Sequence, residues 1–591
     1  MYANILVEYG AKALDQTFTY IIPDSLKDTL KVGMKVKVPF RNTLINGFVL
    51  EITNDCNNNN NLKEIASITD EYFCLNKELL ELGKKIKELT LCSLIQAYQA
   101  MLPSSMKIKT IKSSYQKYDE YLEFINKDVT INYTNNNKRS TKLLNNEKIL
   151  KKEYSLDIVK KLIKENIIKI NKVNKYRINI DNNNFKKKEL TLEQKEVVDK
   201  VEASFNKSET FLLHGVTGSG KTEVYMELIE KVVKTGKCAI LLVPEISLTH
   251  QIVSRFYSRF GSDVAIFHSA LSDGEKYDEY HKILNGDVHI VVGTRSAIFV
   301  PFDKIGIIIL DEEQSSNYKQ DSNPRYHARD IALLRSKYHN CPVVLGSATP
   351  SLETMARAKK GVYTLLSLTK RIGKSVMPTT KIVDMQEEYK KRNMIISDYL
   401  DQKIREKLES NEQVLLMLNR RGFSTIVNCK NCGYTFKCPH CEISLTYHKT
   451  CNNLRCHYCG YTINNPDTCP SCMEKSLTNF GLGTEKLEEE INKRYNVKTV
   501  RMDADTTSRK GSQDEIISKI ENEDVNIIVG TQMISKGFDF PKVTLAAIIN
   551  ADDSLNIPDF RSGENTFELI TQTIGRAGRA SDKSDAVIQT F

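Results

Sequence analysis

Residues 214–225 read HGVTGSGKTEVY, and the class of the fold follows from them. It contains the pattern G-x-x-x-x-G-K-T at 215–222, whose glycines let backbone N–H groups approach phosphate oxygens. The strand-like residues 211–214 precede the pattern, and the helix-like run EVYMELIEKVV follows it. Because strand, loop and helix N-terminus come in the required order, a chance match is improbable. The sequence therefore predicts an α/β domain that binds the phosphates of ATP.

Polar residues in and after this loop are the candidate catalytic residues. Lys221 is expected to hold the β- and γ-phosphates, and Thr222 a Mg²⁺ ion. Downstream, the buried-strand pattern IIILDEEQ places Asp311 to hold Mg²⁺ and Glu312 to orient the attacking water. Acidic pairs are usually solvated surface residues, so this one is informative only because it ends an apolar strand after a phosphate loop. The predicted cofactor-binding set also contains three glycines, Gly215, Gly218 and Gly220.

Apolar runs alternate with helical segments on both sides of this stretch, which is typical of parallel sheets covered on both faces. The first group of runs lies at 211–215, 239–244, 289–293, 305–312 and 342–347. The second group lies at 413–419, 526–531 and 544–552. The sequence therefore predicts an α/β protein with two lobes, each built on a parallel sheet.

The segments before the lobes have different patterns. Residues 1–55 contain short alternating runs that predict a β-rich unit, and residues 76–101 have helical spacing. Residues 140–180 read as a helix followed by strands, which suggests a winged-helix-like module. The predicted domains are 1–105 (β-rich), 106–185 (winged-helix-like), 186–370 (lobe one) and 371–591 (lobe two, with an insert at 426–476).

Composition restricts the class of protein. The chain has 591 residues, of which 40% are hydrophobic and 27% charged, as in soluble proteins. It contains no apolar run long enough to cross a membrane, and its first residues lack a basic segment typical of signal peptides. We therefore expect a cytoplasmic protein with no membrane partner and with reduced thiols, in which paired cysteines are metal ligands.

The net charge of +10 is concentrated in one segment. Residues 138–188 hold 16 lysines and arginines against 5 acidic residues. This predicts a phosphate-binding surface. An equally weighted alternative is a general bias toward lysine and asparagine, which is also visible at 57–61 and 135–138.

Four C-x-x-C pairs lie within the predicted insert. Eight thiolates imply two zinc ions, because structural zinc takes four ligands in a tetrahedron. The spacing alone leaves the pairing open. The insert is small and polar, so metal binding would supply its folding free energy. The eight predicted ligands are Cys429, Cys432, Cys438, Cys441, Cys456, Cys459, Cys469 and Cys472. Residues left over are Cys451, His440, His448 and His457, for which a surface role is favoured over replacement of a ligand.

The order of further motifs along the chain resembles the motif order of the superfamily-two helicases. The ladder runs LTLEQ, GVTGSGKT, LVPEISLT, GTRSAIF, DEEQ, GSATPS, GTQMISKGFDFP and QTIGRAGR. The resemblance implies two RecA-like lobes, with Gln194 at the adenine and with Arg576 and Arg579 reaching the γ-phosphate. It implies that four residues couple the nucleotide to DNA, Arg295, Ser347, Thr349 and Lys536.

The region from about residue 190 onward closely resembles the PriA family of primosomal DNA helicases. The resemblance is carried by FHSALSDGEK, YKQDSNPRYHARDIA, LNRRGFS, CHYCG, GLGTEKLEEE and PDFRSGENTFELITQTIGRAGRA. More weakly, LDQTFTYIIPDSL and VGMKVKVPF resemble that family's domain for the 3′ end of a nascent strand. The resemblance also implies nested zinc sites, one with Cys429, Cys432, Cys469 and Cys472, the other with Cys438, Cys441, Cys456 and Cys459.

The chain departs from the family pattern at several positions. Gln314 stands where the acid box commonly ends in His, so we expect altered coupling rather than inactivity. Thr19 replaces an acid, which puts specific capture of a 3′ end in doubt, and Arg41 replaces a Gly. The chain ends where relatives usually continue, so we expect either a fragment or a missing C-terminal domain.

The family resemblance implies an ATP-dependent helicase that moves 3′ to 5′, recognises branched or stalled replication forks and initiates primosome assembly. Its implied partners are branched and single-stranded DNA, primosome proteins, a helicase loader and a single-stranded-DNA-binding protein. The alternatives are a fork-binding scaffold that recruits the loader with little unwinding, and a translocase acting on other branched DNA. The cysteine-rich insert argues against the translocase.

Overall fold

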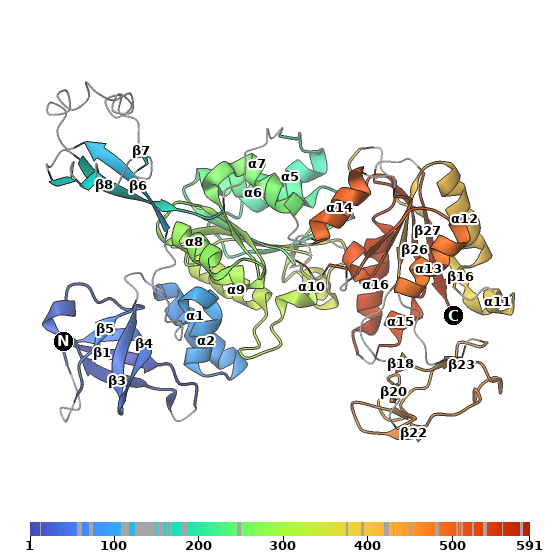
Figure 1. Cartoon of the computed structure of the whole chain (residues 1–591), viewed down its shortest axis with the longest axis horizontal. Helices are drawn as coiled ribbons and strands as arrows, with labels where there is room; N and C mark the ends of the chain where they lie inside the picture. The colour runs from blue at the N-terminus through green and yellow to red at the C-terminus, as the bar shows by residue number, and fades with distance from the viewer. Residues whose placement is uncertain are drawn as a thin grey trace.

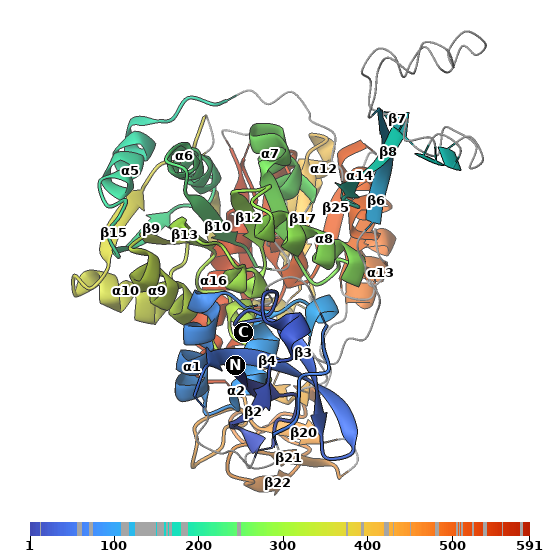
Figure 2. The same ribbon diagram turned by 90° about the vertical axis from the view of Figure 1, so that its left-hand side faces the viewer.

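Two α/β lobes form the body of the protein, and smaller units are attached to them (Figure 1). The computed structural model describes residues 1–11, 14–55, 62–69, 75–107, 117–124, 149–150, 159–160, 163–164, 168–178, 187–244, 250–373, 376–391, 395–418, 425–429, 431–448, 451–478, 484–503, 506–507, 509, 512–522, 525–535, 540–557, 559–579 and 583–591. In both views the N-terminal sheet and the cysteine-rich insert lie on the same side of the lobes (Figures 1 and 2).

Lobe one is a seven-stranded parallel sheet with the order β11-β12-β10-β13-β14-β9-β15. Most of its strand residues are buried apolar side chains, as expected for a sheet covered on both faces. The strands are β9 (Thr210–Gly215), β10 (Cys238–Leu242), β11 (Val264–Phe267), β12 (Ile290–Gly293), β13 (Ile305–Asp311), β14 (Val343–Ser347) and β15 (Thr364–Leu368). The helices are α5 (Leu192–Glu202), α6 (Lys221–Lys234), α7 (His250–Phe260), α8 (Asp273–Leu284), α9 (Ala328–His339) and α10 (Leu352–Lys359).

Lobe two is a six-stranded parallel sheet with the order β16-β27-β26-β17-β25-β24. Its strands are β16 (Thr379–Asp384), β17 (Gln413–Met417), β24 (Thr499–Met502), β25 (Ile527–Gly530), β26 (Val543–Ile548) and β27 (Asp585–Thr590). Its helices are α11 (Met385–Lys390), α12 (Asp398–Glu409), α13 (Thr484–Tyr495), α14 (Ser512–Asn522), α15 (Asp552–Leu555) and α16 (Ser562–Ile574). The predicted class of two α/β lobes with parallel sheets is confirmed.

The N-terminal unit is an antiparallel five-stranded sheet with the order β2-β1-β4-β3-β5, as the β-rich prediction requires. Its strands are β1 (Tyr2–Val7), β2 (Thr17–Ile21), β3 (Lys35–Phe40), β4 (Thr43–Thr53) and β5 (Ser67–Ile68). Two helices follow, α1 (Lys77–Thr90) and α2 (Leu94–Met101). They replace the single helical run expected over 76–101, because Leu91 ends α1 in the left-handed conformation with φ 55°.

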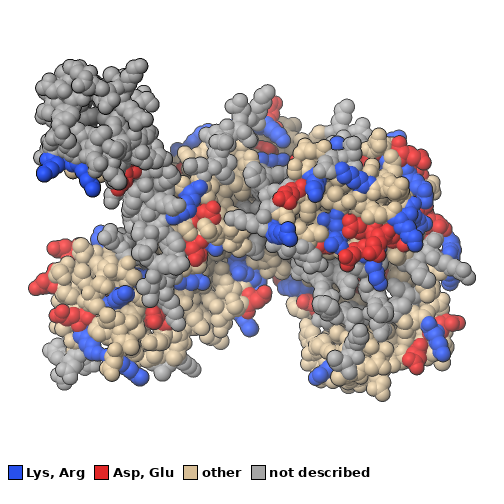
Figure 3. All heavy atoms as spheres, in the orientation of Figure 1, with Lys and Arg blue, Asp and Glu red and all other residues tan. Residues whose placement is uncertain are grey.

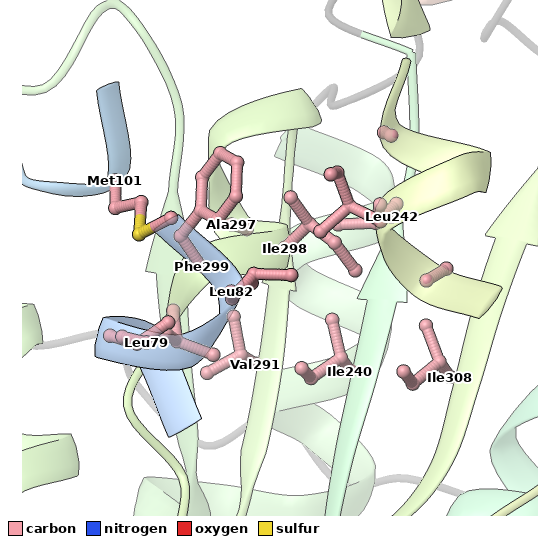
Figure 4. Close-up of a cluster of buried hydrophobic side chains, with 14 of the residues drawn as sticks. Leu79, Leu82, Met101, Ile240, Leu242, Val291, Ala297, Ile298, Phe299 and Ile308 are labelled. Atoms are coloured by element: carbon pink, nitrogen blue, oxygen red, sulfur yellow. The ribbon is translucent and has the colours of Figure 1, made fainter. Parts of the chain in front are cut away.

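Helices α1 and α2 pack into the core of lobe one. Leu79, Leu82 and Met101 share one buried cluster with Val291 and Phe299 (Figure 4). Beside this apolar contact, a buried ion pair joins Glu78 to Arg335 of α9. The Arg335 Nε and Nη2 atoms donate to the two Glu78 carboxylate oxygens at 2.6 and 2.7 Å. The N-terminal unit is therefore fastened to lobe one rather than tethered by a linker.

The predicted winged-helix-like module falls mostly outside the described residues. What is described is a three-stranded antiparallel sheet of β6 (Lys117–Phe124), β7 (Ile149–Leu150) and β8 (Ile168–Lys175). Most of the basic segment 138–188 and both asparagine runs also lie outside these residues. On the part of the surface that is described, basic and acidic side chains are interspersed over both lobes (Figure 3).

The cysteine-rich insert follows β17 and consists of very short strands. Four of them form one sheet in the order β18-β20-β21-β22, and β19 pairs with β23. Their bounds are Thr425–Ile426 (β18), Asn428–Cys429 (β19), Thr446–His448 (β20), Asn453–Arg455 (β21), Thr462–Asn464 (β22) and Leu477–Thr478 (β23). Among the described residues, no helix has the length and apolar character that crossing a membrane would require.

Candidate active site and zinc centres

The phosphate loop joins the end of β9 to the start of α6, as predicted. Gly218 and Gly220 adopt positive φ angles of 81° and 78°, which glycine tolerates best. A Cβ on Gly220 would lie 2.3 Å from Ile372 Cδ1, so this position has no room for a side chain. Lys221 is the first residue of α6, and its Nζ donates to the Gly215 carbonyl at 2.8 Å. The Lys221 ammonium therefore bonds to the backbone of the loop itself.

Gln194 supports this loop from the N-terminus of α5. Its Oε1 accepts from Thr191 N at 2.9 Å, and its Nε2 donates to the Ser219 carbonyl at 2.9 Å. The side chain is 2% exposed. In this conformation each end of the amide bonds the chain itself, and each end keeps the capacity for one further hydrogen bond, such as one to an adenine.

The acidic residues lie at the carboxyl end of β13, next to the phosphate loop. Tyr225 of α6 donates its hydroxyl proton to Asp311 Oδ1 at 2.9 Å. Burial and the neighbouring charge of Glu312 raise the pKa of Asp311 to about 6, although Lys221 opposes this shift. Glu312 has a positive φ of 47°, a strained conformation of the kind that often marks functional sites.

Gln314 connects the acidic residues to lobe two. Its Nε2 lies 2.7 Å from Glu312 Oε2 and 3.2 Å from Glu568 Oε1 of α16. Gln572, one turn further along α16, donates to the same two oxygens at 3.0 and 3.2 Å. Two amide groups therefore bridge a carboxylate of each lobe, and Gln314 forms a hydrogen bond between the lobes from the position where the family commonly has His.

The segment around Ser347 and Thr349 is held by the same group. Ser347 Oγ donates to Gln314 Oε1 at 2.6 Å, and Thr349 N donates to Ser347 Oγ at 2.9 Å. Glu313, which the sequence analysis did not single out, is 1% exposed and accepts from Ser351 N at 2.8 Å. Its signal was its place as the third acid of the box, two residues after the end of a buried strand.

The loop that carries Arg576 and Arg579 lies against the phosphate loop. A Cβ on Gly575 would be 2.4 Å from Thr217 Oγ1, so the two loops touch across the lobe interface. Arg579 Nε donates to the Gly575 carbonyl at 3.5 Å, a long bond within its own loop. The two predicted arginines thus belong to a segment of lobe two that contacts the phosphate loop.

Arg295 lines a cleft of about 690 Å³ between the α2 region and lobe one. The cleft wall includes Lys107, Lys276, Arg295 and Lys319 but one acidic residue, Asp321. Arg295 Nη1 donates to the Lys319 carbonyl at 2.6 Å, which fixes its guanidinium to the cleft wall. The fourth predicted coupling residue, Lys536, lies outside the described residues.

The structure brings the eight cysteines together in two groups of four. Cys429, Cys432, Cys469 and Cys472 form one group, and Cys438, Cys441, Cys456 and Cys459 form the other. The sulfur–sulfur distances of Cys429–Cys472, Cys432–Cys469 and Cys438–Cys459 are 3.5, 3.6 and 3.5 Å. A tetrahedron with Zn–S bonds of about 2.3 Å has edges of about 3.8 Å, so both groups fit zinc. The nested arrangement closes each site only when the second half of the insert returns to the first.

Each C-x-x-C pair forms the same backbone turn. The residue after the second cysteine donates its N–H to the carbonyl of the first cysteine, at 2.8 to 3.0 Å in the four turns. That residue has positive φ every time, at Gly433, Glu442, Gly460 and Met473. Two of the four turns therefore place a side chain in a conformation that favours glycine. Of the leftover residues, Cys451 is exposed, and the His448 and His457 rings lie 5.1 Å apart.

Two departures from the family pattern lie in the N-terminal sheet. Thr19 Oγ1 donates to Asn4 Oδ1 at 2.8 Å, and Asn4 Nδ2 donates to Glu51 Oε2 at 2.9 Å. The sheet therefore carries a carboxylate two hydrogen bonds from Thr19. Arg41 has a φ of 53°, which explains why glycine suits this position.

Two lobes with a phosphate loop, an acidic strand end and bridging amides define a nucleotide-driven helicase core. Family models agree, matching a DEAD/DEAH box helicase at 191–358 and a helicase conserved C-terminal domain at 473–581. Two further models match the 3′ DNA-binding domain (3′BD) of PriA at 4–103 and the Cys-rich region of the PriA DNA helicase at 438–463.

Curated relatives named replication restart protein PriA match along the whole chain. The Bacillus subtilis protein is 41% identical across 100% of this chain and 83% of its own length. The Chlamydia muridarum protein is 37% identical across 100% of this chain and 82% of its own. The Treponema pallidum protein is 34% identical across 98% and 78%. The chain therefore belongs to the PriA family of replication restart proteins and is an ATP-dependent DNA helicase.

Proposed function

We propose that the chain uses ATP bound between its lobes to move 3′ to 5′ along DNA at branched or stalled replication forks. There it would initiate primosome assembly with primosome proteins, a helicase loader and a single-stranded-DNA-binding protein. Family membership supports the fork and the partners. The bridge between Glu312 and Glu568 through Gln314 and Gln572 is the observation that carries the motor.

In the ATP site, we assign phosphate binding to Lys221 and metal binding to Thr222 and Asp311. Lys221 would exchange the Gly215 carbonyl for the phosphates, since its ammonium already points along the loop. A bound Mg²⁺ supplies positive charge to the phosphates, and Asp311 would hold it as a carboxylate. The raised pKa of Asp311 reflects a buried acid next to Glu312, an arrangement that a cation relieves.

Glu312 is assigned the orientation of the attacking water, and Arg576 and Arg579 the charge of the transferred phosphoryl group. The amide bridges affect the attack of this water because they hold the Glu312 carboxylate to α16. Opening the lobes would release Gln572 from Glu312 and free this carboxylate from lobe two. ATP hydrolysis and lobe movement are therefore coupled at one carboxylate.

For DNA, we assign contacts to the basic cleft and to the units that flank it. The cleft has four lysines or arginines against one acid, which suits a phosphate backbone. Arg295, Ser347 and Thr349 would relay the DNA-bound state to Gln314, since Ser347 already bonds its amide. Lys536 keeps its predicted role in coupling. The two zinc-fitting groups would stabilise an insert that contacts DNA or partner proteins.

The test is DNA-stimulated ATP hydrolysis, compared across forks with a free and with a blocked 3′ end, followed by strand displacement on a fork with a lagging-strand gap. We expect stimulated hydrolysis and unwinding on the gapped fork. Stimulation that is equal for free and blocked ends would show that the chain does not recognise a free 3′ end, the outcome that the replacement of an acid by Thr19 allows. Tight fork binding with no strand displacement would support the scaffold alternative and contradict the motor.

A further inference from the structure

The segment that joins the two lobes lies directly on the phosphate loop. Val216 N donates to the Leu368 carbonyl at 3.1 Å, and Ile372 N donates to the Gly218 carbonyl at 3.1 Å. The Ile372 side chain also fills the space that a side chain at Gly220 would need. The connection between lobes is thus a wall of the nucleotide site, and it holds Arg371 between these two anchors.

Arg371 uses its guanidinium to join three segments. Its Nη2 donates to Thr217 Oγ1 at 3.2 Å and to the Gly575 carbonyl at 3.3 Å. Its Nη1 donates to the Ala577 carbonyl at 3.2 Å and to the Val376 carbonyl at 3.3 Å. Thr217 belongs to the phosphate loop, whereas Gly575 and Ala577 flank Arg576 in lobe two. One side chain therefore links the phosphate loop to the backbone on both sides of a predicted catalytic arginine.

The position is electrostatically unfavourable in the absence of an anion. Burial and the nearby positive charge of Arg579 both lower the pKa of Arg371. Two guanidinium groups near a phosphate loop repel each other, and a bound triphosphate would offset that repulsion. The planar guanidinium group of arginine can donate to several oxygens at once. The compact ammonium group of a lysine is less suited to this.

We propose that Arg371 is a positioning residue for ATP hydrolysis, which fastens the loop 575–579 to the phosphate loop and so orients Arg576 and Arg579. This inference rests on the proposed ATPase mechanism. Arg371 acts through the arginines of lobe two, and its effect on the chemical step exceeds its effect on nucleotide binding.

The test compares Arg371→Ala and Arg371→Lys with Lys370→Ala, a neighbouring exposed lysine, in DNA-stimulated ATP hydrolysis by the full chain. We expect kcat to fall about 10- to 100-fold in both Arg371 variants, because misplaced catalytic groups cost rates of this order. The KM for ATP and the Kd for a fluorescent ADP analogue should change less than about threefold. The lysine variant keeps the positive charge. If it fails to restore kcat, the loss comes from the planar geometry of the guanidinium group and not from its charge.

A combined variant separates positioning from an independent contribution. Arg576→Ala together with Arg579→Ala removes both groups that Arg371 positions, so adding Arg371→Ala to this variant should lower kcat by less than about threefold more. Multiplied losses would overturn the inference, as would a raised KM with unchanged kcat or an Arg371→Ala protein as active as Lys370→Ala. Wild-type protein without DNA-stimulated hydrolysis would overturn the proposed function and this inference with it.

Discussion

Lobe one and the cysteine-rich insert hold their sites in opposite ways. The phosphate loop of lobe one rests on a sheet whose strands are buried apolar residues, including Leu212 and Leu213 just before the loop. The insert has strands of two or three residues and a small buried cluster, in which Cys438 and Cys456 are themselves predicted zinc ligands. The first site is shaped by the packing of the sheet beneath it, whereas we expect the second to depend on bound metal for its folding.

This difference separates the two kinds of function. A phosphate loop held by a packed sheet is suited to release and rebind nucleotide in every cycle without losing its shape. A metal-held insert can carry a surface outward from lobe two without a large core of its own. Removing the metal should therefore unfold the insert and leave the nucleotide site intact. Disturbing the packing of lobe one should destabilise that lobe and leave the insert intact.

The largest expected effect comes from removing a zinc ligand. Cys456→Ser should lower the zinc content below two ions per chain and unfold the site formed by Cys438, Cys441, Cys456 and Cys459. The reason is that structural zinc contributes on the order of 10 kcal/mol of folding free energy. Nucleotide affinity should remain that of the wild type. Zinc is measured by mass spectrometry, and Cys451→Ser, an exposed cysteine of the insert, is the matched control. Loss of ADP binding in Cys456→Ser would contradict the independence of the nucleotide site from the insert.

The next effect tests the packing that fastens α1 to lobe one. Glu78→Ala leaves Arg335 buried with its carboxylate partner removed, which should cost about 3–5 kcal/mol of unfolding free energy. Glu81→Ala on the exposed face of α1 is the control. Zinc content should stay unchanged, since the insert is held by its metal. Denaturant unfolding of lobe one with the same midpoint as wild type would contradict this.

The same residue gives a pH dependence. Burial alone would raise the pKa of Glu78, but the charge and hydrogen bonds of Arg335, with those of His339, lower it from 4.5 to about 2. A lowered pKa stabilises the fold above the ordinary value, and this contribution is lost as pH falls from about 5 toward 2. Thermal unfolding should show a weaker acid dependence in Glu78→Gln over that range. An unchanged acid dependence would place the titrating groups elsewhere.

A smaller effect is expected at the bridge between the lobes. Gln314→Ala removes hydrogen bonds to both carboxylates, so DNA-stimulated kcat should fall about tenfold, equivalent to about 1.4 kcal/mol. Compared with Gln314→Ala, the variant Gln314→His should have a higher kcat below about pH 6.5. A protonated imidazole has two N–H donors for the two carboxylates, whereas a neutral one has a single donor. Equal activity of the histidine variant from pH 6 to 8 would argue against the bridge.

The smallest effect concerns the zinc turns. Glu442→Gly and Met473→Gly should each stabilise the insert by about 0.5–1 kcal/mol, because the residue after the second cysteine has positive φ. Gly433→Ala and Gly460→Ala should be destabilising by a similar amount. Resistance to zinc chelation, followed over time, measures this directly. Glycine variants that lose zinc faster than wild type would show that the side chains, not the backbone, stabilise these turns.

The sequence predicted the parts of the fold whose signals are local. The phosphate loop, the apolar strands and the C-x-x-C pairs each lie within a short stretch, and the structure has a strand, turn or cysteine group at each. The split of the helical run at Leu91 was missed, because an isolated left-handed residue leaves the apolar spacing intact. The Glu78–Arg335 pair could not be predicted from the sequence either, because the two residues are 257 positions apart.

The candidate site shows the same limit. Asp311 and Glu312 were recognisable because they end an apolar strand, but the bridge from Gln314 to Glu568 depends on how two lobes meet. Arg371 gave no signal at all, because a single arginine in a connecting segment resembles many solvated ones. Spacing also left the zinc pairing open until the chain's return over itself was known.

The most direct test of a motor driven from the phosphate loop is Lys221→Ala, with Lys234→Ala at the exposed end of the same helix as the control. Fork binding by gel shift and DNA-stimulated ATP hydrolysis are measured on the same samples. We expect Lys221→Ala to bind forks like the wild type and to lose hydrolysis by at least 100-fold, while Lys234→Ala keeps both. Unimpaired DNA-stimulated hydrolysis in Lys221→Ala would contradict the account.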